Sequence, residues 1–231
     1  MILNYSDFIE NLLAAGFSIG GSNDEGIYAV VTWGWRETPP YDTPVRWHTE
    51  DPETDPWEWR MRVLDERNDI AYAKLFFKKT GYITRDWYPY FLAARRGAET
   101  FEDAYEDGKI SHFAKRIYDV VTENDVLPSH AIKKLAGFAK DDKSGFDRAL
   151  TELQMKMFLT MCGRQQKMSQ KGEEYGWSSS VFCTTERFFG EDVFEKAAKI
   201  SAEEAHVAIK EQVLKLNPLA QDKKIMKFIL G

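Results

Sequence analysis

Aromatic rings and cations alternate along the N-terminal half of this chain, and together they could bind a flat, anionic ligand. Six of the seven tryptophans lie there. Because aromatic planes stack on bases while cations bind phosphates, we predict a ligand cleft. It is bordered by Trp57, Trp59, Arg60, Lys74 and Trp87. The alternative is a core that uses large rings and whose charged neighbours point to water.

Three cations in the second half could contact a nucleic-acid backbone. Arg164, Lys167 and Lys171 follow one another with no acidic residue before Glu173. Cations on a hairpin tip can bind phosphates whatever the base sequence. We therefore predict backbone contacts at these three residues, with a solvated loop that is basic by chance as the alternative.

Groups suited to catalysis or metal binding are sparse. His48 lies in RWHTEDPETDPWEW, where a His–carboxylate pair could transfer protons, although dense carboxylates in a proline-rich loop are more often solvated turn residues. Ser18 lies in GFSIG, but a helix precedes it and a glycine-rich turn follows, whereas a nucleophile elbow needs a strand before and a helix after. The two cysteines, Cys162 and Cys183, have no accompanying ligands at metal-binding spacing. We expect no metal and no cofactor.

The elements around the three cations follow the order of a winged helix-turn-helix over residues 111–190. Ser111 caps a first helix with apolar residues at a 3.6-residue spacing. Pro128 opens a second helix that ends at Gly137, and a third helix follows Lys143. Residues 157–162 and 181–189 are typical of the two strands of a hairpin. The periodicity predicts one core formed by Phe113, Ile117, Leu135, Phe146, Leu150, Leu153 and Phe158.

Residues 1–97 are predicted to form a separate α+β region. We expect a helix over residues 6–15 capped by Ser6, a strand over 27–35, a proline-rich loop over 37–56, and a helix that begins after Asp55. A hairpin over 71–84 and a helix or connection over 87–96 follow. An acidic linker over 98–110 leads to the winged helix, and helices over 191–231 end the chain. These C-terminal helices are expected to pack on the wing or on a second subunit in a homodimer.

Composition indicates a soluble, cytoplasmic protein. Hydrophobic residues make up 43% and charged residues 29% of the chain, and no apolar run reaches the roughly 18–20 residues that cross a bilayer. The N-terminus lacks the basic region of a secretory signal. Residues 1–57 carry a net charge of −8 and the remainder +2. The third helix presents both signs (Lys143, Asp147, Arg148, Thr151 and Glu152), which disfavours base-specific reading.

Three segments carry a family resemblance: WHTEDPETDPWEWR, AYAKLFFKKTGYITRDWYPYFLAARRG and ALTELQMKMFLTMCGRQQK. They resemble bacterial proteins described as related to AlkZ, over most of residues 45–190. AlkZ-type proteins are DNA glycosylases that excise alkylated bases, built from tandem winged helices and a β-barrel. These enzymes depend on a Gln-hydrophobic-Gln or Gln-hydrophobic-Asp motif, which this chain lacks. The resemblance therefore implies the fold and a link to DNA repair, and it assigns no catalytic residue.

Two functions follow from these patterns. The first is non-sequence-specific binding of duplex or damaged DNA by a helix-rich α+β protein, with its enzymatic status left open. The second is a module that binds a small flat aromatic ligand or a partner protein and uses the winged helix as a scaffold. Binding that weakens steeply with salt would favour the first function, and stabilisation by a nucleotide would favour the second.

Overall fold

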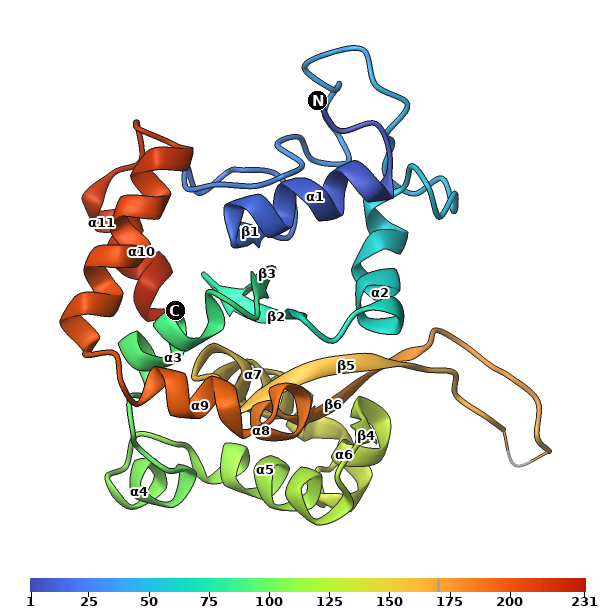
Figure 1. Ribbon diagram of the computed structural model, residues 1–231. Coiled ribbons are helices and arrows are strands. Elements are labelled where there is room, and N and C mark those ends of the chain that lie inside the picture. The colour runs from blue at the N-terminus through green and yellow to red at the C-terminus, as the bar shows by residue number, and fades with distance from the viewer. Residues whose placement is uncertain (170) are drawn as a thin grey trace.

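One antiparallel sheet runs through the α+β fold of the computed structural model, which describes residues 1–169 and 171–231, with the side chain of Lys140 left out (Figure 1). The six strands have the order β1-β3-β2-β5-β6-β4. Their bounds are β1 Phe17–Ile19, β2 Ile70–Phe76, β3 Lys79–Thr84, β4 Leu127–Pro128, β5 Leu159–Gln165 and β6 Ser179–Thr184. β2 and β5 join the two halves of the sheet at the pair Tyr72–Met161.

Local capping signals determine where the N-terminal helices begin. Helix α1 (Tyr5–Ala15) begins after Asn4, whose side chain accepts from Asp7 N, and not after Ser6 as predicted. Helix α2 (Pro56–Glu66) begins after Asp55, as the sequence indicated. Helix α3 (Tyr88–Arg95) follows the β2–β3 hairpin.

The segment between β1 and α2 differs from the sequence-based expectation. Residues 27–35 are largely buried, yet they form no strand among the described residues. They are attached to β1 by separate bonds: Ile19 N donates to Tyr28 O (3.0 Å), and Val30 N donates to the Ser18 hydroxyl (2.9 Å). β-Branched and aromatic residues therefore supply core side chains here without a continuous backbone ladder.

The segment predicted as a winged helix-turn-helix contains helix, short strand, helix, helix, strand and strand. Its helices are α5 (His112–Asn124), α6 (Ser129–Leu135) and α7 (Lys143–Met155), with a 3-10 turn, Lys140–Asp142, before α7. Six of the seven predicted core residues are buried or half-buried, but Leu135 is 54% exposed because it lies in the last turn of α6 and faces outward. The winged-helix assignment of this element order stays a prediction.

The predicted second wing strand is shorter than expected. β6 ends at Thr184, whose side chain accepts from Arg187 N and so caps a short helix, α8 (Thr185–Phe189). The acidic segment before α5 also contains a helix, α4 (Phe101–Glu106), whose Phe101 ring stacks on Tyr118 at 3.7 Å. This packing ties the expected linker to α5, and the division into four segments stays a prediction.

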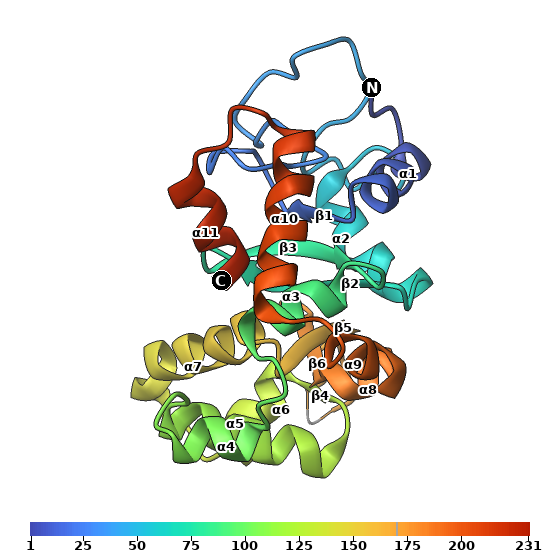
Figure 2. The same cartoon turned by 60° about the vertical axis from the view of Figure 1, so that its left-hand side comes forward.

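The C-terminal helices are α9 (Glu191–Ala197), α10 (Ala202–Leu216) and α11 (Asp222–Leu230), and they pack against α3. Figure 2 shows α10 in front of α3. The apolar residues Ile209, Val213 and Phe228 of these helices belong to one buried cluster with Phe91 of α3 and Phe17 of β1. Phe228 of α11 also stacks on Phe76 of β2, with ring centroids 4.1 Å apart. The apolar faces of α10 and α11 are therefore used within the chain. Within the described residues, no helix combines the length and apolarity that a membrane crossing requires.

Candidate nucleic-acid interface

The β5–β6 hairpin projects beyond the body of the molecule (Figure 1). Its ladder ends where Gln165 lies opposite Ser179, but pairing continues beyond that point. Tyr175 N donates to Lys167 O (3.0 Å), and the Gln166 side chain donates to Gly176 O (2.9 Å). These bonds keep the two sides of the projecting segment paired. This segment, from Arg164 to Ser180, is the β5–β6 arm.

The three predicted cations all lie on this arm, in different surroundings. The Arg164 side chain is 47% exposed and lies 3.7 Å from a carboxylate oxygen of Glu58 on α2. Lys167 is half-buried, and Lys171 is exposed near the tip. Burial lowers the pKa of His130 on α6, and the charge of Lys167 lowers it further. The arm therefore carries three cations, of which Arg164 is partly neutralised at the base, and two exposed acids, Glu173 and Glu174, on its returning side.

The arm also exposes aromatic and apolar side chains that the sequence reasoning missed. Trp177 is 84% exposed, Tyr175 55% and Met168 54%. Tryptophan is mostly buried in folded proteins, so an indole this exposed on a projecting arm is the kind of side chain found at contact surfaces. In the sequence, the run Tyr-Gly-Trp at residues 175–177, inside an otherwise polar segment, could have predicted this exposed surface.

Helix α7, the third helix of the predicted winged helix-turn-helix, is partly covered. Lys74 N on β2 donates to the Gln154 side chain (2.9 Å), which places β2 against the C-terminal half of α7. Glu152 accepts from the backbone N–H and the hydroxyl of Ser111 (3.0 and 2.7 Å), and Thr151 is buried. The N-terminal half of α7 is the more exposed half of the helix. Its exposed charges have both signs, which is unsuited to base reading.

The five residues of the predicted aromatic cleft are not brought together. Trp59 is fully buried and stacks on Phe8 with ring centroids 5.1 Å apart. The cavity beside it is about 10 Å³, too small for any ligand. Trp87 is half-buried and packs against a separate cluster, where its ring lies edge-on to Phe17 at 5.4 Å. Lys74 lies beside α7.

Trp57 and Arg60 remain together on the outer face of α2. The guanidinium carbon of Arg60 lies 3.2 Å from the Trp57 ring centroid, and the His48 ring lies 4.8 Å away. Trp57 is 37% exposed whereas Trp59 is buried, as their spacing of two residues on a helix requires. This side of α2 is next to the base of the arm, through the Glu58–Arg164 ion pair.

Within residues 1–169 and 171–231, neither of the two residues considered for catalysis, His48 and Ser18, makes the hydrogen bonds that its predicted catalytic role requires. The Asp55 carboxylate accepts from four backbone N–H groups, those of His48, Thr49, Glu50 and Trp57, at 2.8–3.0 Å. It therefore holds a loop in place and makes no hydrogen bond to the His48 ring. Ser18 is 1% exposed in β1, and its hydroxyl donates to Ile19 O (2.8 Å).

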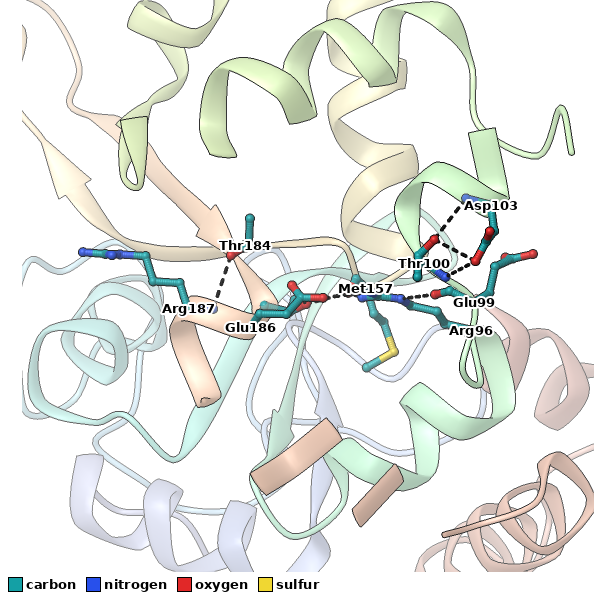
Figure 3. Close-up of polar contacts among 9 residues, drawn as sticks. Arg96, Glu99, Thr100, Asp103, Met157, Thr184, Glu186 and Arg187 are labelled. Carbon is teal, nitrogen blue, oxygen red and sulfur yellow. Dashed lines mark hydrogen bonds and ion pairs between the residues drawn. The ribbon is translucent and has the colours of Figure 1, made fainter. Parts of the chain in front are cut away.

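Arg96, at the end of α3, lies inside a polar cluster. Figure 3 shows its guanidinium between Glu99, Met157 and Glu186. It donates to Glu99 O (2.9 Å), pairs with the Glu186 carboxylate (2.8 Å) and has a side chain only 11% exposed. Its guanidinium also covers the Phe158 ring at 4.3 Å. Arg96 thus joins α3 to α8 and is not available to DNA.

The two cysteines are neighbours across the β5–β6 hairpin, and both are free thiols. Cys162 lies at an irregularity in the ladder, and Cys183 is buried. The hydrogen bond that its thiol donates to Cys162 raises the pKa of Cys183, with burial as a further cause. In the part of the chain that the structure describes, no group of three or more His, Cys, Asp or Glu residues could hold a metal ion.

Comparison with known proteins identifies the family. The family described as AlkZ related matches residues 2–230, which is nearly the whole chain. The chain belongs to the AlkZ-related family. No curated protein matches it, and no solved structure does. Membership extends the resemblance carried by residues 45–190 to both ends of the chain, including the helices that cover α3.

Proposed function

We propose that this AlkZ-related protein binds DNA without sequence specificity, through the β5–β6 arm. The observation that carries the proposal is the arm itself, which combines Arg164, Lys167 and Lys171 with the 84%-exposed Trp177. Family membership supports a connection with base damage, since the family is described by its relation to AlkZ. The proposal assigns no catalytic residue.

The arm suits backbone contact better than base reading. Cations that contact phosphates release condensed counterions, so affinity arises whatever the sequence and falls with salt. The net charge of −6 confines this attraction to a local surface. Among the described residues, neither Lys167 nor Lys171 forms an ion pair within 4.0 Å, so no internal pair must be broken when they contact a phosphate.

The test is the salt dependence of DNA binding by the full chain. Lys167→Ala and Lys171→Ala should each weaken binding to duplexes of unrelated sequence by a similar factor. Each should also reduce the slope of log affinity against log salt by about 0.9. Arg164→Ala should have a smaller effect because Glu58 already neutralises part of its charge.

Lys199→Ala is the matched control, because it removes the same charge from the exposed connection between α9 and α10. It should leave affinity and slope unchanged. The proposal is wrong if the intact protein binds neither duplex nor single-stranded DNA at low salt. It is also wrong if the control weakens binding as much as the two arm variants do.

A further inference from the structure

A groove of about 540 Å³ lies between α7, the β2–β3 hairpin and the last residues of the chain. Figure 2 shows α7 beside the C-terminal end. A volume of this size is within the range of small-molecule sites, roughly 300–1,000 Å³. Ten residues line it: Lys74, Lys78, Asp147, Arg148, Thr151, Glu152, Met155, Lys156, Leu230 and Gly231.

The side chains of the lining include four cations and two acids. In the described part of the chain, none of Lys74, Lys78, Arg148 and Lys156 lies within 4.0 Å of a carboxylate oxygen. Elsewhere this acidic chain pairs many of its cations, including Lys79, which lies 2.9 Å from Glu25. A convergence of unpaired cations on a groove of this size favours an anionic occupant.

Internal contacts hold several of these cations in position. The Lys74 amine donates to the Thr151 hydroxyl (3.3 Å), while the backbone N–H of the same lysine donates to Gln154. Arg148 Nε donates to Ser144 O (3.2 Å). Lys78 lies in the β2–β3 turn with a φ of 63°, an uncommon conformation for a residue other than glycine. Preorganised donors lose less entropy when a ligand binds.

A fifth cation lies behind the groove wall. The Arg95 guanidinium donates to the backbone oxygens of Leu75, Met155, Phe228 and Ile229 at 2.7–3.0 Å. No carboxylate of the described residues pairs with it within 4.0 Å. Four carbonyl dipoles thus face its charge, which contributes to the potential around Met155 and Gly231.

The remaining lining suits a nucleoside. Met155 and Leu230 supply a polarizable, apolar surface, and Leu230 is 53% exposed. Asp147 is exposed on α7 and makes no ion pair within the described residues, so its carboxylate can accept from a sugar hydroxyl. Glu152 is already engaged by Ser111. We propose that this groove binds a nucleoside monophosphate, with its phosphate among the lysines and Arg148.

The site is separate from the arm, so it can be tested separately. Titration calorimetry on the full chain would compare adenosine 5′-monophosphate, inorganic phosphate and adenosine. The monophosphate should bind with a Kd in the micromolar range. Inorganic phosphate and adenosine should each bind at least about 10-fold more weakly, because each occupies only one end of the groove. Lys78→Ala and Lys156→Ala should each reduce affinity about 10-fold, the loss of one hydrogen bond to a charged group.

Asp147→Asn should weaken binding of the monophosphate but not of inorganic phosphate. Lys143→Ala is the matched control, since Lys143 is an exposed lysine of α7 outside the groove lining, and it should bind normally. Lys167→Ala should also bind the nucleotide normally, which separates this site from the proposed DNA contact.

Three results would overturn the proposal. The first is no binding of the monophosphate at millimolar concentration. The second is equal affinity for inorganic phosphate and the monophosphate. The third is a loss of DNA binding in Lys78→Ala and Lys156→Ala without nucleotide binding by the unaltered protein, which would make the groove part of a DNA surface.

Discussion

Trp177 offers the sharpest test of the arm, because its removal separates stacking from charge. The side chain is 84% exposed, so Trp177→Ala removes almost no internal packing. The free energy of unfolding should change by no more than about 0.5 kcal/mol. Stacking of one base on an aromatic ring contributes roughly 1–3 kcal/mol, so the Kd for DNA with unpaired bases should rise about 5- to 150-fold.

The measurement is fluorescence anisotropy of a labelled single strand at several salt concentrations. Because Trp177→Ala removes no charge, the salt slope should stay that of the unaltered protein while the whole line shifts to weaker binding. Trp177→Phe should recover most of the affinity. Leu219→Ala, which removes an 89%-exposed apolar side chain between α10 and α11, is the control. Unchanged affinity in Trp177→Ala, or an equal loss in the control, would refute a stacking role.

Three further predictions concern stability. Leu150→Ala should lower the free energy of unfolding by roughly 2–5 kcal/mol in urea titrations, because Leu150 is 8% exposed in the core; a loss below 1 kcal/mol would contradict tight packing. Asp55→Ala should cost at least ~3 kcal/mol, since four backbone N–H groups lose a charged acceptor; a Tm equal to that of the unaltered protein would argue against this. Hydrogen bonds from Lys224 and Lys79 lower the pKa of Glu25 in the folded protein. Ionised Glu25 therefore stabilises the fold at every pH above the unfolded pKa of about 4.3, and this stabilisation is lost as the pH falls through the folded pKa. Glu25→Gln should therefore lower the Tm at pH 7 and have little effect at pH 2, and a pH-independent difference would count against the ion pair.

Elements with local signals could be predicted from the sequence. The caps Asp55 and Ser111 identify the starts of α2 and α5, because a side chain that accepts from the first helical turn is encoded within three residues. The predicted strand over residues 27–35 failed because a strand also needs a partner along its length. Those residues meet β1, which is only three residues long.

The candidate sites depended on contacts that the sequence does not encode locally. Trp57, Trp59 and Trp87 all looked available, but tertiary packing buries Trp59 and places Trp87 against another cluster. Of the residues that line the 540 Å³ groove, only Lys74 was among those predicted to bind a ligand. The lining comes from β2, α7 and the end of α11, and no spacing in the sequence relates these three segments.

The sheet pairing between Tyr72 and Met161 has a consequence for dividing the chain. A fragment ending near residue 97 would leave β2 as an open edge, and one beginning near residue 111 would leave β5 open. Each unsatisfied edge is a template for a foreign strand, so either piece alone would tend to aggregate. Produced together, the pieces carry complementary edges, with Lys74 and Gln154 on opposite sides of the cut. The chain is therefore a candidate for reassembly from two co-expressed halves, and solubility that appears only on co-expression would reveal it.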